Sequence, residues 1–219
     1  YNPINKNIKP VYTSPGNKIV ADYIIRAMAI DEDNTLWCGT DNGVYLIHNG
    51  KVIQSYRNNE QDSNNISNNG VTSLLIDRNK NTWIGTKEGL NLYNTKSKKF
   101  QRFNAESGLS DDGIKSIRED SKGNIWIATN HGLSKFDPFN KKFYRYTIAD
   151  GLYADQFIAN ATTIDSNGIF YFGTNNGLIS FKPENITPNA FIPLVVITVI
   201  KVFNTPIASF EDSSIFNTY

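Results

Sequence analysis

Short apolar runs alternate with polar turns along most of this chain. In the clearest unit the apolar runs are residues 71–76, 82–86, 90–93 and 100–103. The segments between them are rich in Asn, Asp, Lys and Gly, which favour turns because their side chains or their backbone freedom suit tight bends. Runs of four to six residues bounded in this way are typical of β-strands. The pattern therefore predicts four short antiparallel strands in one unit.

This unit recurs four times in one register. Each copy has an Asp, an aromatic residue six positions later, a Thr three further on and a Gly three beyond that. The aromatic residues are separated by 46, 43 and 45 residues. The repeated positions are Asp31, Trp37, Gly43, Asp77, Trp83, Gly89, Asp120, Trp126, Gly132, Asp165, Tyr171 and Gly177. A period of about 40–50 residues with several strands is typical of β-propeller blades.

The repeat predicts an all-β fold of four four-stranded antiparallel blades, a partial propeller. Its positions have structural explanations. The final Gly suits a hairpin turn with positive φ. The aromatic residue provides apolar area for packing between blades. Small residues stand four positions before each Asp, where innermost strands would crowd around a central channel; they are Ala27, Ser73, Ser116 and Ala161.

The blade boundaries follow from the repeat. Residues 1–23 resemble the end of a preceding blade and its connection, so the chain is expected to be a fragment of a larger protein. The predicted blades are residues 24–57, 58–103, 104–146 and 147–183, and a linker and a new strand occupy 184–219. Four blades are fewer than most closed propellers have. We therefore expect a homodimer, formed through exposed blade faces or by strand exchange.

Composition excludes some functions. Lys and Arg number 22 and Asp and Glu 21, so no overall charge favours nucleic acid or a membrane surface. The apolar run at 191–203 is interrupted by Pro193 and Lys201 and is too short to span a bilayer. Cys38 is the only cysteine, which excludes an internal disulfide, and its position in an apolar strand predicts a buried small side chain.

Candidate binding chemistry lies where the copies differ, in tight turns and blade connections. The candidate ligand-binding residues are Asn130, His131, Asp111, Asp112, Asp155 and Gln156. Neutral amides and carboxylates on such loops suit a ligand rich in hydroxyl groups. An ordinary solvated loop is the alternative for each of them.

Metal, cofactor and catalytic sites are not predicted. Residues 77–88 match some ligand positions of an EF-hand loop, but Thr82 stands where that loop requires Gly. His48 and His131 are the only histidines, and neither is near a nucleophile motif.

The segment 108–136, which contains Gly-Leu, an Asp and Gly-Asn-Ile-Trp-Ile-Ala-Thr, resembles the regulator-propeller repeat of bacterial two-component sensors. Residues 151–183 resemble the final blade of that family. Residues 193–204 resemble the first strand of the triple-tyrosine immunoglobulin-like domain that follows it, a β-sandwich that would be truncated here. The resemblance covers nearly the whole chain.

The resemblance implies an extracytoplasmic ligand-sensing region of a membrane signalling receptor, with a histidine kinase or a diguanylate cyclase as output. It implies a carbohydrate or another small polar ligand, and it carries over no ligand residue. Two alternatives remain open. The streptogramin lyases have a similar propeller repeat, so the chain could be an enzyme, and a non-binding structural or dimerisation scaffold would show the same repeat.

Overall fold

The computed structural model describes residues 23–59, 61–62, 64–186, 201–202 and 205–206. The chain divides into two units, residues 1–185 and 186–219. In the second unit, β16 (Lys201–Val202) pairs antiparallel with β17 (Thr205–Pro206). Most of the predicted strand at 193–204 lies outside the described residues.

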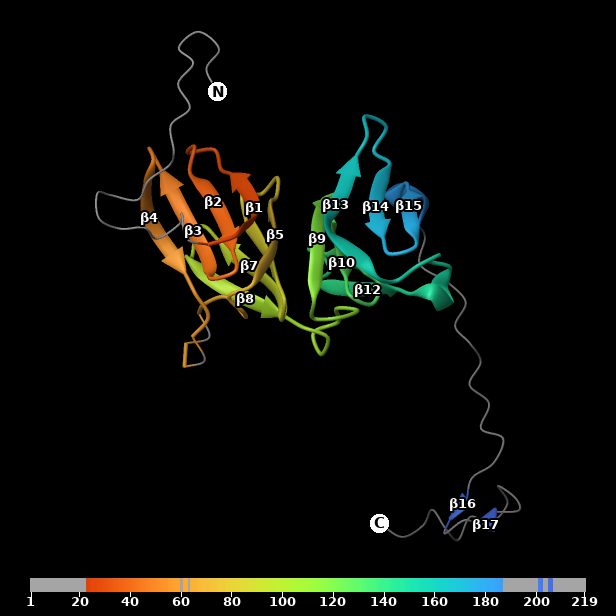
Figure 1. Ribbon diagram of the computed structural model, residues 1–219. Helices are drawn as coiled ribbons and strands as arrows, with labels where there is room; N and C mark the ends of the chain where they lie inside the picture. The colour runs from red at the N-terminus through yellow and green to blue at the C-terminus, as the bar shows by residue number, and fades with distance from the viewer. Residues whose placement is uncertain (1–22, 60, 63, 187–200, 203–204, 207–219) are drawn as a thin grey trace. The chain divides into compact units, whose positions relative to one another are not determined.

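The first unit consists of four antiparallel sheets, which follow one another in chain order and are called blades 1 to 4 (Figure 1). Blade 1 contains β1 (Ile25–Ile30), β2 (Leu36–Thr40), β3 (Gly43–His48) and β4 (Lys51–Tyr56). Blade 2 contains β5 (Val71–Ile76), β6 (Thr82–Thr86), β7 (Gly89–Asn94) and β8 (Lys99–Phe103). Blade 3 contains β9 (Ile114–Glu119), β10 (Ile125–Thr129), β11 (Leu133–Asp137) and β12 (Lys142–Tyr146).

Blade 4 differs from the prediction of four strands. In the described part of the chain it has three, β13 (Phe157–Ile164), β14 (Phe170–Thr174) and β15 (Gly177–Phe181). The short 3₁₀ helix η2 (Pro183–Asn185) follows β15 where the other blades turn into an outer strand. Pro183 has no backbone N–H to donate to a ladder, and its fixed φ suits the start of a helical turn. The all-β propeller-blade class is confirmed.

The first strands of successive blades lie beside one another, so β1, β5, β9 and β13 form the inner side of the unit. Ser73 and Ser116 are buried there, as the small residues of the repeat predict. Asn160 sits in an irregular part of β13 and has φ 57°. Its side-chain amide donates to the carbonyl oxygens of Arg26 at 2.7 Å and Thr72 at 3.0 Å. The inner strand of blade 4 is therefore tied to blades 1 and 2.

The repeated Asp and aromatic residue hold each turn between first and second strands. In blade 2, Asp77 Oδ1 accepts the backbone N–H groups of Asn79 and Asn81 at 2.9 Å each, and Asp77 Oδ2 accepts from Trp83 Nε1 at 2.8 Å. The same aromatic-to-Asp bond recurs in blades 1, 3 and 4. The repeat thus closes a turn and fixes the ring with one carboxylate.

The aromatic residues also join neighbouring blades, which confirms their predicted role. The ring of Trp83 in blade 2 lies 5.6 Å from Phe136 in blade 3, and Trp126 in blade 3 lies 5.0 Å from Phe181 in blade 4. Trp83 also stacks on Phe103 of its own blade at 6.1 Å. The contacts of Trp83 belong to an apolar cluster that fills the space between blades 2 and 3.

The repeated Thr and Gly close the turn between second and third strands. Thr86 Oγ1 donates to the carbonyl oxygen of Gly89 at 2.9 Å, and the corresponding bond is present in all four blades. Gly89 has φ 114°. This is the left-handed region that L side chains rarely adopt, so the predicted positive φ is confirmed. Cys38 is also buried as predicted, against Tyr45 and Ile47.

Candidate functional site

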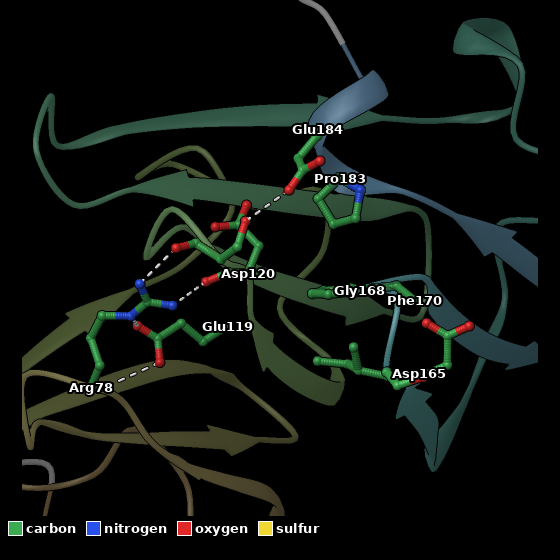
Figure 2. Close-up of a pocket in the computed structure, with 11 residues that line it drawn as sticks. Arg78, Glu119, Asp120, Asp165, Gly168, Phe170, Pro183 and Glu184 are labelled. Carbon is green, nitrogen blue, oxygen red and sulfur yellow. Dashed lines mark hydrogen bonds and ion pairs between the residues drawn. The ribbon is translucent and has the colours of Figure 1, made fainter.

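The candidate site lies at the turn end of the blades, which is the end that carries the Asp-containing turns between first and second strands. A pocket of about 310 Å³ opens there between blades 2, 3 and 4 (Figure 2). It is lined by Arg78, Glu119, Asp120, Ser121, Ile164, Asp165, Ser166, Gly168, Phe170, Pro183 and Glu184. This volume is at the lower end of the range for small-molecule sites.

Arg78 links blade 2 to blade 3 at one side of the pocket. Its Nε donates to Glu119 Oε1 at 2.6 Å, and its backbone N–H donates to Glu119 Oε2 at 3.0 Å. Its Nη1 donates to the carbonyl oxygen of Ser121 at 2.7 Å, and its Nη2 donates to that of Asp120. One guanidinium therefore holds both a carboxylate and the turn of the next blade.

Glu184 approaches the same turn from the opposite side, as Figure 2 shows. Its Oε1 accepts from Ser121 Oγ at 3.2 Å, and its Oε2 is 3.3 Å from Lys182 Nζ. Hydrogen bonds from Lys182 and Ser121, together with the lysine charge, lower the pKa of Glu184. Since Glu184 lies in η2, the segment that leaves blade 4 is fastened to blade 3.

Two aspartates of the repeat, Asp120 and Asp165, also line the pocket. Asp120 is buried and accepts from Trp126 Nε1 at 2.9 Å, so its oxygens serve the fold. The backbone N–H groups of Ile169 and Asn167 bind Asp165, and these bonds lower its pKa although slight desolvation opposes the effect. These bonds therefore favour the ionised form of Asp165.

The pocket lining thus combines one guanidinium, four carboxylates and three apolar side chains, although the buried carboxylate of Asp120 is already bonded to Trp126. Carboxylate oxygens accept hydrogen bonds from hydroxyl or ammonium groups, and a guanidinium donates to ring or carbonyl oxygens. The arrangement can bind a small, strongly polar molecule. Among the described residues, no group of three or more His, Cys, Asp or Glu gathers in a way that could hold a metal ion.

The residues predicted from sequence lie at the opposite, connection end of the blades. This end carries the turns between second and third strands and the connections from blade to blade. His131 Nδ1 is 3.0 Å from Asp111 Oδ2, and the Asn130 backbone N–H donates to the carbonyl oxygen of Gly113. The structure therefore brings Asn130, His131 and Asp111 together.

The other three predicted residues serve neighbouring turns. Asp112 Oδ1 accepts from the Ala105 backbone N–H at 2.6 Å. The Asp155 carbonyl oxygen accepts from the Gly132 N–H at 2.8 Å. Gln156 Oε1 accepts from Asn175 Nδ2 at 2.9 Å. The first contact lies within one connection and the other two join a connection to a turn, and the binding role of all six residues stays a prediction.

Sequence reasoning missed Arg78, Glu119 and Glu184. A signal for Arg78 was present, because the position after each repeated Asp differs between copies: it is Glu32, Arg78, Ser121 or Ser166. Variation at a repeat position is where specificity is expected. The sequence could not show that Arg78 reaches the turn of the next blade, since these residues are more than forty positions apart.

Comparison with known proteins identifies the class. The family described as two component regulator propeller matches residues 65–88 and 108–131, which lie in blades 2 and 3 and their preceding connections. The resemblance drawn from the sequence is therefore confirmed: these segments are regulator-propeller repeats. The histidine kinase P4 of Formosa agariphila is 28% identical over 171 residues, which are 78% of this chain and 9% of that protein.

Solved structures show the same architecture. The extracellular domain of a putative hybrid two component system from B. thetaiotaomicron matches with a TM-score of 0.73 and 28% identity, over 91% of this chain and 28% of that one. A second such domain from B. thetaiotaomicron, 22% identical, has a TM-score of 0.65 over 81% of this chain and 23% of that one. The chain therefore resembles the sensor propellers of two-component systems, and the first of these structures confirms the predicted extracytoplasmic location.

A catalytically inactive virginiamycin B lyase from Staphylococcus aureus, crystallised with quinupristin, shares the fold at 15% identity. Its TM-score is 0.55, over 75% of this chain and 57% of the lyase. The chain spans only a small part of the histidine kinase and of both sensor domains. In the described residues, no helix is long and apolar enough to cross a membrane.

Replacing Arg78 with Ala is expected to lower the free energy of unfolding by about 1 kcal/mol. The side chain is 49% exposed, so water and salt screen its pairing with Glu119. Urea unfolding at low and high salt measures the loss, which should shrink at high salt. Lys80→Ala is the matched control, because Lys80 and Glu32 form a pair that is exposed on both sides. Equal effects of the two variants would contradict a structural role for Arg78.

The Asp111–His131 contact predicts a pH dependence. Partial burial of Asp111 opposes its ionisation, but hydrogen bonds from His131, the Gly113 amide and Asn130 outweigh it and lower the pKa of Asp111. A carboxyl whose folded pKa is depressed stabilises the fold above its unfolded pKa, and this contribution disappears as the pH falls through the folded pKa. Asp111→Asn should lower the free energy of unfolding by less than about 1 kcal/mol at pH 7 and should leave it unchanged in strong acid. Chemical unfolding across pH tests this, and a difference that persists in acid would contradict it.

Proposed function

We propose that this chain is the extracytoplasmic ligand-sensing propeller region of a bacterial membrane signalling receptor, with a histidine kinase as its output. The regulator-propeller repeats at 65–88 and 108–131 carry this proposal. The match to an extracellular domain of a hybrid two component system over 91% of the chain supports it, and the named relative, a histidine kinase, supports the output.

The ligand that we propose is a carbohydrate or another small polar molecule. The pocket at the turn end supports this chemistry, since its lining combines Arg78 with several carboxylates. The connection end supports it too, because His131 is 64% exposed beside Asp111. A hydroxyl-rich molecule needs many donors and acceptors at short range, and both ends offer them.

A thermal-shift titration with neutral, acidic and amino oligosaccharides tests the proposal. A ligand at a hundredfold excess over its Kd stabilises the native state by about 2.7 kcal/mol. For a chain of this size that corresponds to a rise in Tm of roughly 5–10 °C. No rise with any oligosaccharide, while the full-length receptor responds to one of them, would place the site elsewhere and would favour a scaffold role for this chain.

Two variants assign the site to one end of the blades. Arg78→Ala should abolish the thermal shift if the ligand occupies the turn end, and His131→Ala should abolish it if the ligand occupies the connection end. Each variant is the control for the other, since the two residues lie at opposite ends. Incubation with quinupristin followed by mass spectrometry tests the lyase alternative, for which cleavage of the antibiotic is the expected result.

A further inference from the structure

A groove opens between blades 2 and 3, beside the outer strand β8, and is called the β8 groove. Its volume is about 360 Å³, which lies within the range for small-molecule sites. One wall is blade 2, and the other is the β11–β12 hairpin of blade 3. The groove therefore lies between two neighbouring blades, on the opposite side of them from the inner strands β5 and β9.

The floor of the β8 groove is apolar and partly open. Leu92, Pro138 and Phe143 are half-buried there. The ring centre of Phe143 lies 4.7 Å from that of Phe136 in its own blade and 5.5 Å from that of Phe103 in blade 2. Both neighbours are buried, so they hold the ring of Phe143 in place. The groove therefore offers a fixed apolar surface, which lowers the entropy that a ligand must lose on binding.

Neutral amides stand at the rim of the β8 groove. Gln101 lies directly opposite Leu92 in the β7–β8 ladder, and Asn79 lies in the turn between β5 and β6. Both residues are exposed, and among the described residues neither side-chain amide has a hydrogen-bond partner. An amide offers two donors on its nitrogen and an acceptor on its oxygen. The rim can therefore bind hydroxyl groups in either role.

The charged residues of the lining are mostly engaged within the protein. Asp77 is buried and accepts from the Trp83 ring. Arg102 Nε donates to the carbonyl oxygen of Asn65 at 2.7 Å, and its Nη2 donates to that of Asp62 at 3.1 Å. The third charged residue, Lys141, is exposed. One negative and two positive charges leave the β8 groove nearly neutral, in contrast to the pocket at the turn end with its four carboxylates.

The β8 groove continues into two neighbouring cavities. One, of about 350 Å³, shares Leu92 and Gln101 with it. The other, of about 420 Å³, shares Arg102, Phe103 and Ser107. Three adjoining cavities thus follow one outer strand, whose five residues span roughly 17 Å at 3.3 Å per residue. A row of this length suits a ligand made of several units better than a single small molecule.

We propose that the β8 groove binds a neutral oligosaccharide. This inference rests on the proposed carbohydrate-sensing function, and it places the ligand between blades 2 and 3 rather than at either end of the blades. A sugar ring has a face of C–H groups and a rim of hydroxyl groups. The C–H face would pack on Phe143 and Leu92, and the hydroxyl groups would bond to Gln101 and Asn79. An acidic chain would meet only Lys141, and an amino sugar would find no free carboxylate in the β8 groove.

Isothermal titration calorimetry of the 219-residue chain with maltotetraose, cellotetraose, laminaritetraose and mannotetraose tests the proposal. We expect one of them to bind, and to bind more tightly than its monosaccharide, which fills only part of the row. Gln101→Ala and Asn79→Ala should each weaken this binding about three- to tenfold, because each removes a hydrogen-bonding group. Both residues are exposed, so neither variant should change urea unfolding. Gln54→Ala is the matched control, since Gln54 is an exposed glutamine opposite Leu46 in blade 1.

Other results would overturn the proposal in distinguishable ways. If a tetrasaccharide binds both groove variants as tightly as the wild type but not Arg78→Ala or His131→Ala, the sensing function stands and the β8 groove is the wrong site. Binding of acidic or amino oligosaccharides alone would also leave the sensing function standing and would contradict the neutral chemistry. An extended peptide that binds in place of any sugar, and more weakly to Gln101→Ala, would assign the groove to a protein partner. Absence of binding with every oligosaccharide would contradict both the groove and the proposed function.

Discussion

Replacing Trp83 with Ala is expected to lower the free energy of unfolding by about 3–5 kcal/mol. The side chain is 1% exposed, and its ring packs on Phe103 of its own blade and on Phe136 of the next. Truncation leaves a cavity between two sheets and removes the donor that Asp77 Oδ2 accepts at 2.8 Å. Equilibrium unfolding in urea, followed by circular dichroism, measures the loss.

Two further variants separate the packing of Trp83 from its hydrogen bond. Trp83→Phe keeps most of the apolar area but removes the Nε1 donor. It should therefore lower the free energy of unfolding by about 1 kcal/mol more than the smaller ring alone would. Tyr171→Phe is the matched control in blade 4, where the hydroxyl lies 3.4 Å from Asp165 and the ring is only partly buried. Tyr171→Phe should lower the free energy of unfolding by no more than about 0.5 kcal/mol. A Trp83→Ala variant as stable as Trp83→Phe would contradict the inter-blade role.

Replacing Gly85 with Ala is expected to destabilise the chain by about 1–3 kcal/mol, although only one methyl group is added. The new Cβ would lie 2.5 Å from Ile114 Cγ2 and 3.0 Å from Ile114 Cβ, both in the next blade. The backbone fixes the position of Ile114 Cβ, so rotation of the isoleucine side chain cannot relieve this contact and the two sheets must move apart. Urea unfolding measures the cost, and the same strain should lower the Tm.

A double-mutant cycle identifies the cause. Ile114→Ala removes the atoms that the new methyl group meets, so Gly85→Ala in that background should cost at least about 1 kcal/mol less than in the wild type. Ala128 occupies the equivalent position in blade 3, and Ala128→Gly should destabilise slightly through backbone entropy. Additive costs of Gly85→Ala and Ile114→Ala would show that the effect does not arise between the blades.

The spacing of the repeat was sufficient to predict the blades, because its signal is local. Asp77 accepts the N–H groups of residues two and four positions later, and Thr86 closes a turn three residues long. Such contacts depend on nearby residues alone, so they recur wherever the pattern recurs. The exception is blade 4, where Pro183 starts η2 and no outer strand follows among the described residues.

The candidate site was less accessible to sequence reasoning. Asp111 and His131 are twenty positions apart, and sequence reasoning placed each on a loop without pairing them. Arg78 reaches Glu119 across 41 positions, and Glu184 reaches Ser121 across 63. Contacts of this kind depend on how one blade follows another, which hydrophobic periodicity does not encode.

The sequence by itself determined the strands, their turns, the blade repeat and the resemblance to sensor propellers, because each rests on spacing within about forty residues of chain. Only the tertiary structure decided which end of the blades holds the pocket and that Arg78 and Glu184 both reach the turn of blade 3. Those features arise from side chains that meet across the spaces between sheets. The angle between neighbouring blades determines which side chains come into contact. That angle is set by the packing of the sheets rather than by the local sequence pattern.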